Sequence, residues 1–142
     1  LDSHLLVPTS SSTTYHVYYS DKGYATSTPF AWLDQDDVTS YGPETVKVEQ
    51  FYTSGTYTYA VYNYSGSCCL GSSGAVVSVY RAGALVAQFT VSSASGNGSS
   101  RWWNVFDFDG ATKTITPRNT LSNTSPRMDA SGKSDPMPAK KP

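Results

Sequence analysis

Apolar and polar residues alternate along much of this chain, in runs that end at turn-forming residues about every ten positions. In the run from Thr56 to Tyr64, for example, Tyr57, Tyr59 and Val61 occupy every second position. A period of two places these side chains on one face of a β-strand. No segment sustains the 3.6-residue period of an amphipathic helix. The pattern therefore predicts an all-β domain.

Short strands with turn signals between them are typical of sandwiches and barrels. We expect an antiparallel β-sandwich of jelly-roll or immunoglobulin-like type, with about eight or nine strands. The segment Arg81–Ala84 is short and contains a glycine, which predicts a hairpin. The predicted strands are Leu1–Val7, Tyr15–Ser20, Phe30–Asp34, Thr45–Phe51, Thr56–Tyr64, Ala75–Arg81, Ala84–Val91, Arg101–Phe108 and Lys113–Thr116.

Composition supports strands and limits the classes of partner. Aromatic residues make up 13% of the 142 residues, and Lys and Glu are scarce, which favours pleated strands over helices. With a net charge of −1, the chain has no excess of basic residues that would argue for nucleic-acid binding. No apolar run approaches the ~20 residues that cross a bilayer, so we expect no membrane insertion. The length fits one domain over residues 1–118 and a Pro- and Ser-rich tail or inter-subunit arm over residues 119–142.

A composition dominated by Tyr, Thr, Ser, Val and Gly, together with three tripeptides of the N-glycosylation type, predicts an extracellular or cell-surface protein. The chain starts at Leu1 rather than at a methionine, as expected of a processed or excised piece of a longer chain. Asn63, Asn97 and Asn123 each begin a tripeptide of the N-glycosylation type, although such tripeptides also arise by chance in chains rich in Ser and Thr.

The two cysteines, Cys68 and Cys69, are adjacent in the sequence. Three arrangements remain open for them: two loop thiols, a disulfide between the neighbours, and bonds to other chains. A disulfide between neighbours is unusual because consecutive Cα atoms lie ~3.8 Å apart, which is closer than the two Cα atoms of an ordinary disulfide.

Acidic residues concentrate in one stretch, where four of the eleven acids lie between Asp34 and Glu44. Crowded carboxylates repel one another, so a cation or a set of hydrogen-bond donors is expected to hold them. Oxygen ligands suit calcium, whereas a histidine ligand favours a transition metal. The alternative is a set of hydrogen-bonded loop acids without a metal. The candidate ligands of a stabilising cation are Asp2, His4, Asp34, Asp36, Asp37 and Glu44.

The motifs around these acids resemble the YfaP-like family of secreted bacterial domains. They are the string Asp2-Ser3-His4-Leu5, the tyrosine pair at 18–19, and the acidic turn that ends in Tyr41-Gly42-Pro43-Glu44. A later strand, Gly55–Val61, also fits, and the resemblance covers roughly the first 65 residues well. It implies a β-sandwich accessory domain without an established catalytic role, in which the acidic turn packs beside the strand that contains Asp2 and His4.

Compared with that family, the chain begins inside the first motif, at Leu1. The resemblance therefore implies that one acidic ligand and an edge strand are missing. Because proteins rarely leave a sheet edge open, we expect self-assembly in which a neighbouring subunit donates a strand or a tail. The alternative is that the sequence was cut from a longer chain.

Aromatic residues on the predicted strands give a second functional hypothesis. Tyr62 and Tyr64 share the strand face opposite to that of Tyr57, Tyr59 and Val61, and Trp102 and Trp103 likewise point to opposite faces. In each case one face is expected to be core and the other at least partly exposed. Exposed rings stack on sugars, which would make the domain a carbohydrate-binding module for a polysaccharide. The alternative is cross-strand aromatic packing that only stabilises the sheet.

Motifs for catalysis are missing from the sequence. It has no G-x-S-x-G elbow, phosphate loop or H-E-x-x-H motif, and Asp107 and Asp109 are a weak basis for a hydrolase. We therefore expect a non-catalytic structural or adhesive module, as a subunit of a surface filament or a part of a multidomain surface protein.

Overall fold

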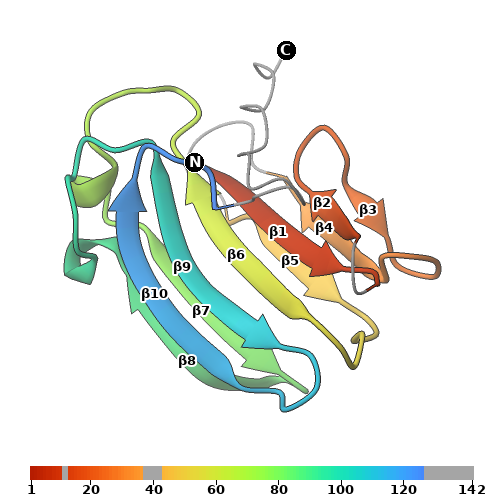
Figure 1. The fold of residues 1–142 in the computed structure, drawn as a ribbon. Helices are drawn as coiled ribbons and strands as arrows, with labels where there is room; N and C mark the ends of the chain where they lie inside the picture. Colours follow the sequence, from red (N-terminus) through yellow and green to blue (C-terminus); the bar gives the residue numbers. More distant parts are fainter. Residues whose placement is uncertain (11–12, 37–42, 127–142) are drawn as a thin grey trace.

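The chain forms two packed layers of antiparallel strands in a computed structural model, which describes residues 1–10, 13–36 and 43–126 (Figure 1). One layer is a five-stranded sheet. The other is built from a three-stranded sheet and a two-stranded sheet. The expected all-β sandwich is confirmed.

The five-stranded sheet has the order β10-β9-β6-β1-β2. β1 is buried along its whole length, because strands pair with both of its edges and side chains cover both of its faces. Leu5 and Val7 face the core between the layers, whereas His4 packs against Trp102 on the outer face. The strands are β1 (Asp2–Pro8), β2 (Thr14–Val17), β6 (Thr56–Tyr62), β9 (Trp102–Asp109) and β10 (Ile115–Ser122).

The second layer is divided into two sheets. In Figure 1, β7 and β8 lie behind β9 and β10, and β5 lies behind β1. The three-stranded sheet has the order β3-β4-β5, so β5 and β7 are both edge strands. The strands of this layer are β3 (Gly23–Tyr24), β4 (Ala31–Gln35), β5 (Thr45–Val48), β7 (Val76–Arg81) and β8 (Ala84–Thr90), and two short 3₁₀ helices, η1 (Leu70–Ser72) and η2 (Val91–Ser93), flank β7 and β8.

The predicted hairpin joins β7 and β8. Ala82 and Gly83 form its turn with φ of 49° and 80°. Positive φ at both central residues is the conformation of a type I′ turn, whose twist matches that of the flanking strands.

Two groups of buried side chains stabilise the sheet. The larger group fills the space between the layers and includes Trp103 and Val105, both 0% exposed. The smaller group covers the outer face of the five-stranded sheet and contains Ala60, Tyr62 and Trp102. Trp102 and Trp103 therefore lie on opposite faces, as the alternation predicted.

The structure differs from the sequence prediction at two strands. β3 was not predicted, because two residues are too few to show alternation. β10 continues to Ser122, past the boundary expected after residue 118. A register shift between Pro117 and Thr120, with Asn119 at φ 47°, carries the strand past its proline. The rest of the predicted tail, from residue 127, lies outside the described residues.

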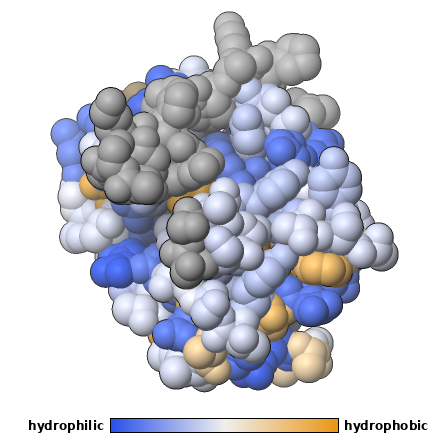
Figure 2. Space-filling view, turned by 45° about the vertical axis from the view of Figure 1, so that its right-hand side comes forward, coloured by the Kyte–Doolittle hydropathy of each residue, from blue (hydrophilic) through white to orange (hydrophobic). Residues whose placement is uncertain are grey.

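The face of the molecule in Figure 2 is mostly polar, with hydrophobic residues scattered singly over it. Scattered apolar residues of this kind are ordinary on a solvated surface. In the part of the chain that the structure describes, no helix is long and apolar enough to cross a membrane.

Candidate functional site

The predicted acidic residues that the structure describes pair with other groups of the protein. The carboxylate of Asp34 lies 2.5 Å from Lys47 Nζ, and that of Asp36 lies 3.4 Å from Lys22 Nζ. The bond from Asp34 raises the pKa of Lys47 above its ordinary value. The first two acids of the turn thus have cationic side chains as partners.

The start of β1 contacts the entry to β5. The Ser3 N–H donates to Glu44 Oε2 at 2.6 Å, and His4 Nδ1 lies 2.8 Å from His16 Nε2. Asp2 is 3% exposed. His16 was not among the predicted site residues, because one histidine in an ordinary strand gives no signal of its own.

The cation site stays a prediction. Asp37 lies outside the described residues. Among residues 1–10, 13–36 and 43–126, no group of three or more His, Cys, Asp or Glu side chains is arranged to hold a metal ion. The partners of Asp34, Asp36 and Glu44 agree with the alternative of hydrogen-bonded acids.

The predicted sugar-binding aromatics do not form an exposed strip. Tyr62, Trp102 and Trp103 are 3%, 1% and 0% exposed, so the expectation of a partly exposed tryptophan is wrong. The reason is cross-strand packing: Tyr62 and Trp102 are register partners with ring centroids 4.6 Å apart, and the Arg101 guanidinium lies over Tyr62. Tyr64 is half-buried beside them.

The predicted modification sites differ in exposure. Asn63 is buried, and its Nδ2 donates to the Ser67 carbonyl, which leaves no room for a glycan in this conformation. Asn97 and Asn123 are exposed. Their glycosylation remains a prediction.

Cys68 and Cys69 lie in the loop between β6 and η1, and their sulfur atoms are joined in a disulfide. The Cys69 sulfur also lies 3.7 Å from Ser99 Oγ, so this loop approaches the one that precedes β9. Their redox state in the native environment stays a prediction.

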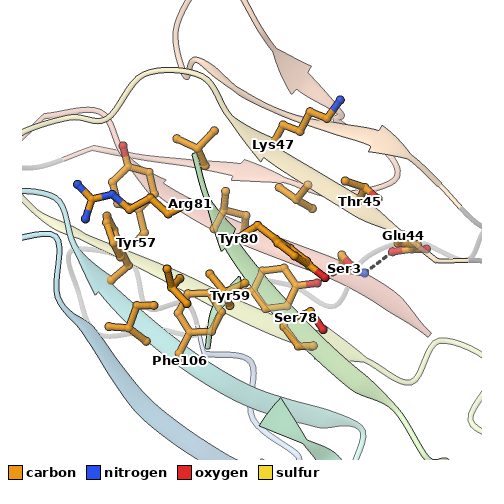
Figure 3. A pocket seen from close by; sticks show the side chains of 18 of the residues that line it. Ser3, Glu44, Thr45, Lys47, Tyr57, Tyr59, Ser78, Tyr80, Arg81 and Phe106 are labelled. Atoms are coloured by element: carbon orange, nitrogen blue, oxygen red, sulfur yellow. Dashed lines mark hydrogen bonds between the residues drawn. The ribbon is translucent and has the colours of Figure 1, made fainter. Parts of the chain in front are cut away.

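A cavity opens between β5 and β7. It has a volume of about 1050 Å³ and is lined by both strands. Figure 3 shows Tyr59 and Phe106, from β6 and β9 of the five-stranded sheet, at its base. We call this cavity the β5–β7 groove. The sheet that forms its floor continues beneath the interval between the two edge strands.

The floor of the β5–β7 groove is aromatic. The Tyr59 and Phe106 rings stack with centroids 5.5 Å apart, and Phe89 stacks on Phe106 at 5.6 Å. Tyr59 Oη lies 2.7 Å from Ser3 Oγ, which fixes the phenol within the floor. At the rim, Val76 and Tyr80 of β7 are 52% and 64% exposed. The groove therefore combines a rigid apolar base with accessible apolar walls.

The two ends of the groove differ in charge. Figure 3 shows Arg81 at one end and Ser3 with Glu44 at the other. The Arg81 side chain is exposed and has neither a hydrogen bond nor an ion pair among the described residues. Lys113 also lines the groove, where its Nζ donates to the Gly110 carbonyl and lies 4.7 Å from the centre of the Phe51 ring. Glu49 follows β5 and also lines the groove, but its carboxylate accepts a hydrogen bond from Trp32 Nε1 of β4, so among the described residues Arg81 is the charged side chain at that end without a partner.

We expect the stability of the domain to fall at alkaline pH because of Tyr59. Burial raises the pKa of its phenol to about 12, above the ordinary value of 10.0. The Tyr59 phenol therefore loses its proton at a lower pH in the unfolded chain than in the folded chain. Its contribution to the free energy of unfolding is complete below pH ~10 and is lost as the pH rises toward 12. Denaturant unfolding between pH 8 and 12 measures this slope, with Tyr59→Phe as the variant that lacks the proton. Equal slopes in the two proteins would contradict the assignment.

Comparison of the chain with protein-family models, with curated proteins and with solved structures found no match. The resemblance to the YfaP-like family therefore stays a prediction from the motifs.

Proposed function

We propose that this domain is a non-catalytic structural module of secreted or cell-surface assemblies, and that it joins its partner by accepting a β-strand in the β5–β7 groove. The observation that carries the proposal is that two edge strands line one cavity above an apolar floor. Such a surface suits β-augmentation, in which an extended segment completes a sheet.

Backbone chemistry favours a polypeptide as the occupant. In an edge strand, about half of the N–H and C=O groups point away from the paired neighbour and lack a ladder partner. β5 contributes four residues and β7 six residues to the two sides of the groove. A strand between them pairs with both rows of groups, whereas a fatty acid of similar volume leaves both rows unpaired.

Side-chain chemistry favours the same occupant. Every second side chain of an inserted strand faces the aromatic floor made by Tyr59 and Phe106, and the others face solvent. At ~25 cal/mol per Å² of apolar surface removed from water, burial of a few Val side chains contributes several kcal/mol to the free energy of binding, from which the entropic cost of association is then subtracted. The partner strand should therefore alternate apolar and polar residues.

The test uses an acetylated, amidated peptide of alternating Val and Thr as the strand probe. We expect saturable binding to the folded domain, with NMR shift changes concentrated in β5 and β7. Dodecanoate is the comparison ligand. Shift changes in β5 and β7 with dodecanoate alone, or an unchanged spectrum with both, would contradict strand acceptance.

A stabilising cation at the acidic turn is the second part of the proposal. Lys22 competes with such a cation for Asp36, so calcium should raise the melting temperature of the EDTA-treated protein more strongly in Lys22→Ala than in the wild type. At a hundred times its Kd, a cation that binds only the folded state adds ~2.7 kcal/mol to the free energy of unfolding. Differential scanning calorimetry measures the shift. Identical melting with calcium and with EDTA, in both proteins, would remove the cation from the account.

A further inference from the structure

The two strands that line the β5–β7 groove run in the same direction. In Figure 1, β5 and β7 run the same way. Figure 3 agrees: Thr45, the first residue of β5, lies at the Glu44 end, and Arg81, the last residue of β7, lies at the other end. A strand inserted between two strands of one direction is either parallel to both or antiparallel to both.

Antiparallel insertion is the favoured choice. Every ladder between the described strands is antiparallel. Antiparallel pairs are slightly more stable per residue, and they outnumber parallel pairs two- to threefold in proteins. An antiparallel occupant starts beside Arg81 and ends beside Glu44.

The charge at the starting end then sets a preference in the occupant. The Arg81 side chain is exposed and has no partner among the described residues. A carboxylate at the N-terminal end of the inserted strand meets the Arg81 guanidinium, whereas a carboxylate at its C-terminal end meets Glu44 instead (Figure 3). The guanidinium of arginine is well suited to pairing with a carboxylate in two parallel hydrogen bonds.

On the basis of the proposed function, we infer that the partner segment is an extended peptide that runs antiparallel to both β5 and β7 and begins with an acidic residue beside Arg81. The acid is followed by alternating apolar and polar residues over the length of the groove. The occupant is thus a segment of a partner protein with a defined polarity.

Two peptides of equal composition test the polarity. Both alternate Val and Thr and are blocked at their termini, which removes the terminal charges. One carries Asp at its N-terminal end, and the other carries Asp at its C-terminal end. By fluorescence anisotropy we expect the first to bind about two- to fivefold more tightly, which is the range of an exposed ion pair. Equal affinity, or a preference for the second peptide, would overturn the inference.

Variants assign the preference to one side chain. Arg81→Gln should abolish the difference between the peptides, and Arg81→Lys should retain part of it. Lys22→Gln is the matched control, because Lys22 is an exposed cation outside the groove. A preference that survives Arg81→Gln, or that disappears in Lys22→Gln, would count against Arg81 as the recognising group.

A spin label at the N-terminus of the acid-first peptide reports direction independently of affinity. We expect it to broaden the amide signals of Ala82 and Gly83 more strongly than that of Thr45. The reverse pattern would show parallel insertion and would overturn the inference, while strand acceptance would still stand. If neither peptide binds, or if sedimentation shows that the groove is closed by a second copy of this chain, both the inference and the proposed partner fail.

Discussion

Replacement of Trp103 by alanine is expected to lower the free energy of unfolding by about 3–5 kcal/mol, the usual range for a buried aromatic residue. Trp103 is 0% exposed in the core between the layers, and its Nε1–H donates to Asn119 Oδ1 at 2.9 Å. The variant removes the ring and leaves the Asn119 oxygen without this donor. Urea unfolding, followed by tryptophan fluorescence, measures the loss.

Trp32→Ala is the matched control for Trp103→Ala. Trp32 is only half-buried, and its ring lies beside the exposed Lys47. Its loss should therefore cost clearly less than that of Trp103. Equal losses in the two variants would contradict the assigned core. The comparison also bears on carbohydrate binding, because a sugar site at Trp103 requires a ring that the fold keeps away from solvent.

A lysine at Val79 is expected to weaken binding of the strand peptide at least tenfold. Val79 lies in β7, lines the β5–β7 groove and packs partly against the core. An ammonium group at this position meets the apolar side chains of the occupant and loses hydration when the peptide binds. A penalty of only 1.4 kcal/mol is a tenfold change in Kd, and burial of an unpaired charge costs more than that.

Two further variants separate this effect from damage to the fold. Val46→Lys places the same charge on β5, across the groove, and should weaken the peptide in the same way. Leu85→Lys is the matched control, because Leu85 is 53% exposed on the hairpin and does not line the groove. Circular dichroism confirms folding in each case. Unchanged affinity in both groove variants, or an equal loss in Leu85→Lys, would contradict strand acceptance.

Local patterns in the sequence were sufficient to predict most strands. The alternation of Tyr57, Tyr59 and Val61 reflects a real division between core and outer face, and the glycine after Ala82 marks the hairpin turn. The end of β10 was harder to predict. Pro117 and Asn119 resemble tail residues in sequence, but the register shift and the hydrogen bonds of Asn119 with Trp103, Ser93 and Ser95 keep them in the sheet.

The β5–β7 groove was not predictable from local patterns. Which strand edges remain unpaired depends on the order of strands in the sheets, and periodicity carries no information about that order. The prediction that Tyr62 or Trp102 is exposed was wrong for the same reason. These two residues are distant in sequence and bury one another across a ladder. The acidic turn was visible because its residues are neighbours in the sequence.

Hydrogen exchange of the backbone amides in β5 and β7 tests the central claim most directly. In the domain alone, amides on the open edges of these strands should exchange faster than those of β6, which is paired on both sides. Saturation with the acid-first peptide should slow exchange in β5 and β7 together, because one strand pairs with both. Protection of neither strand, or of only one, would contradict the account.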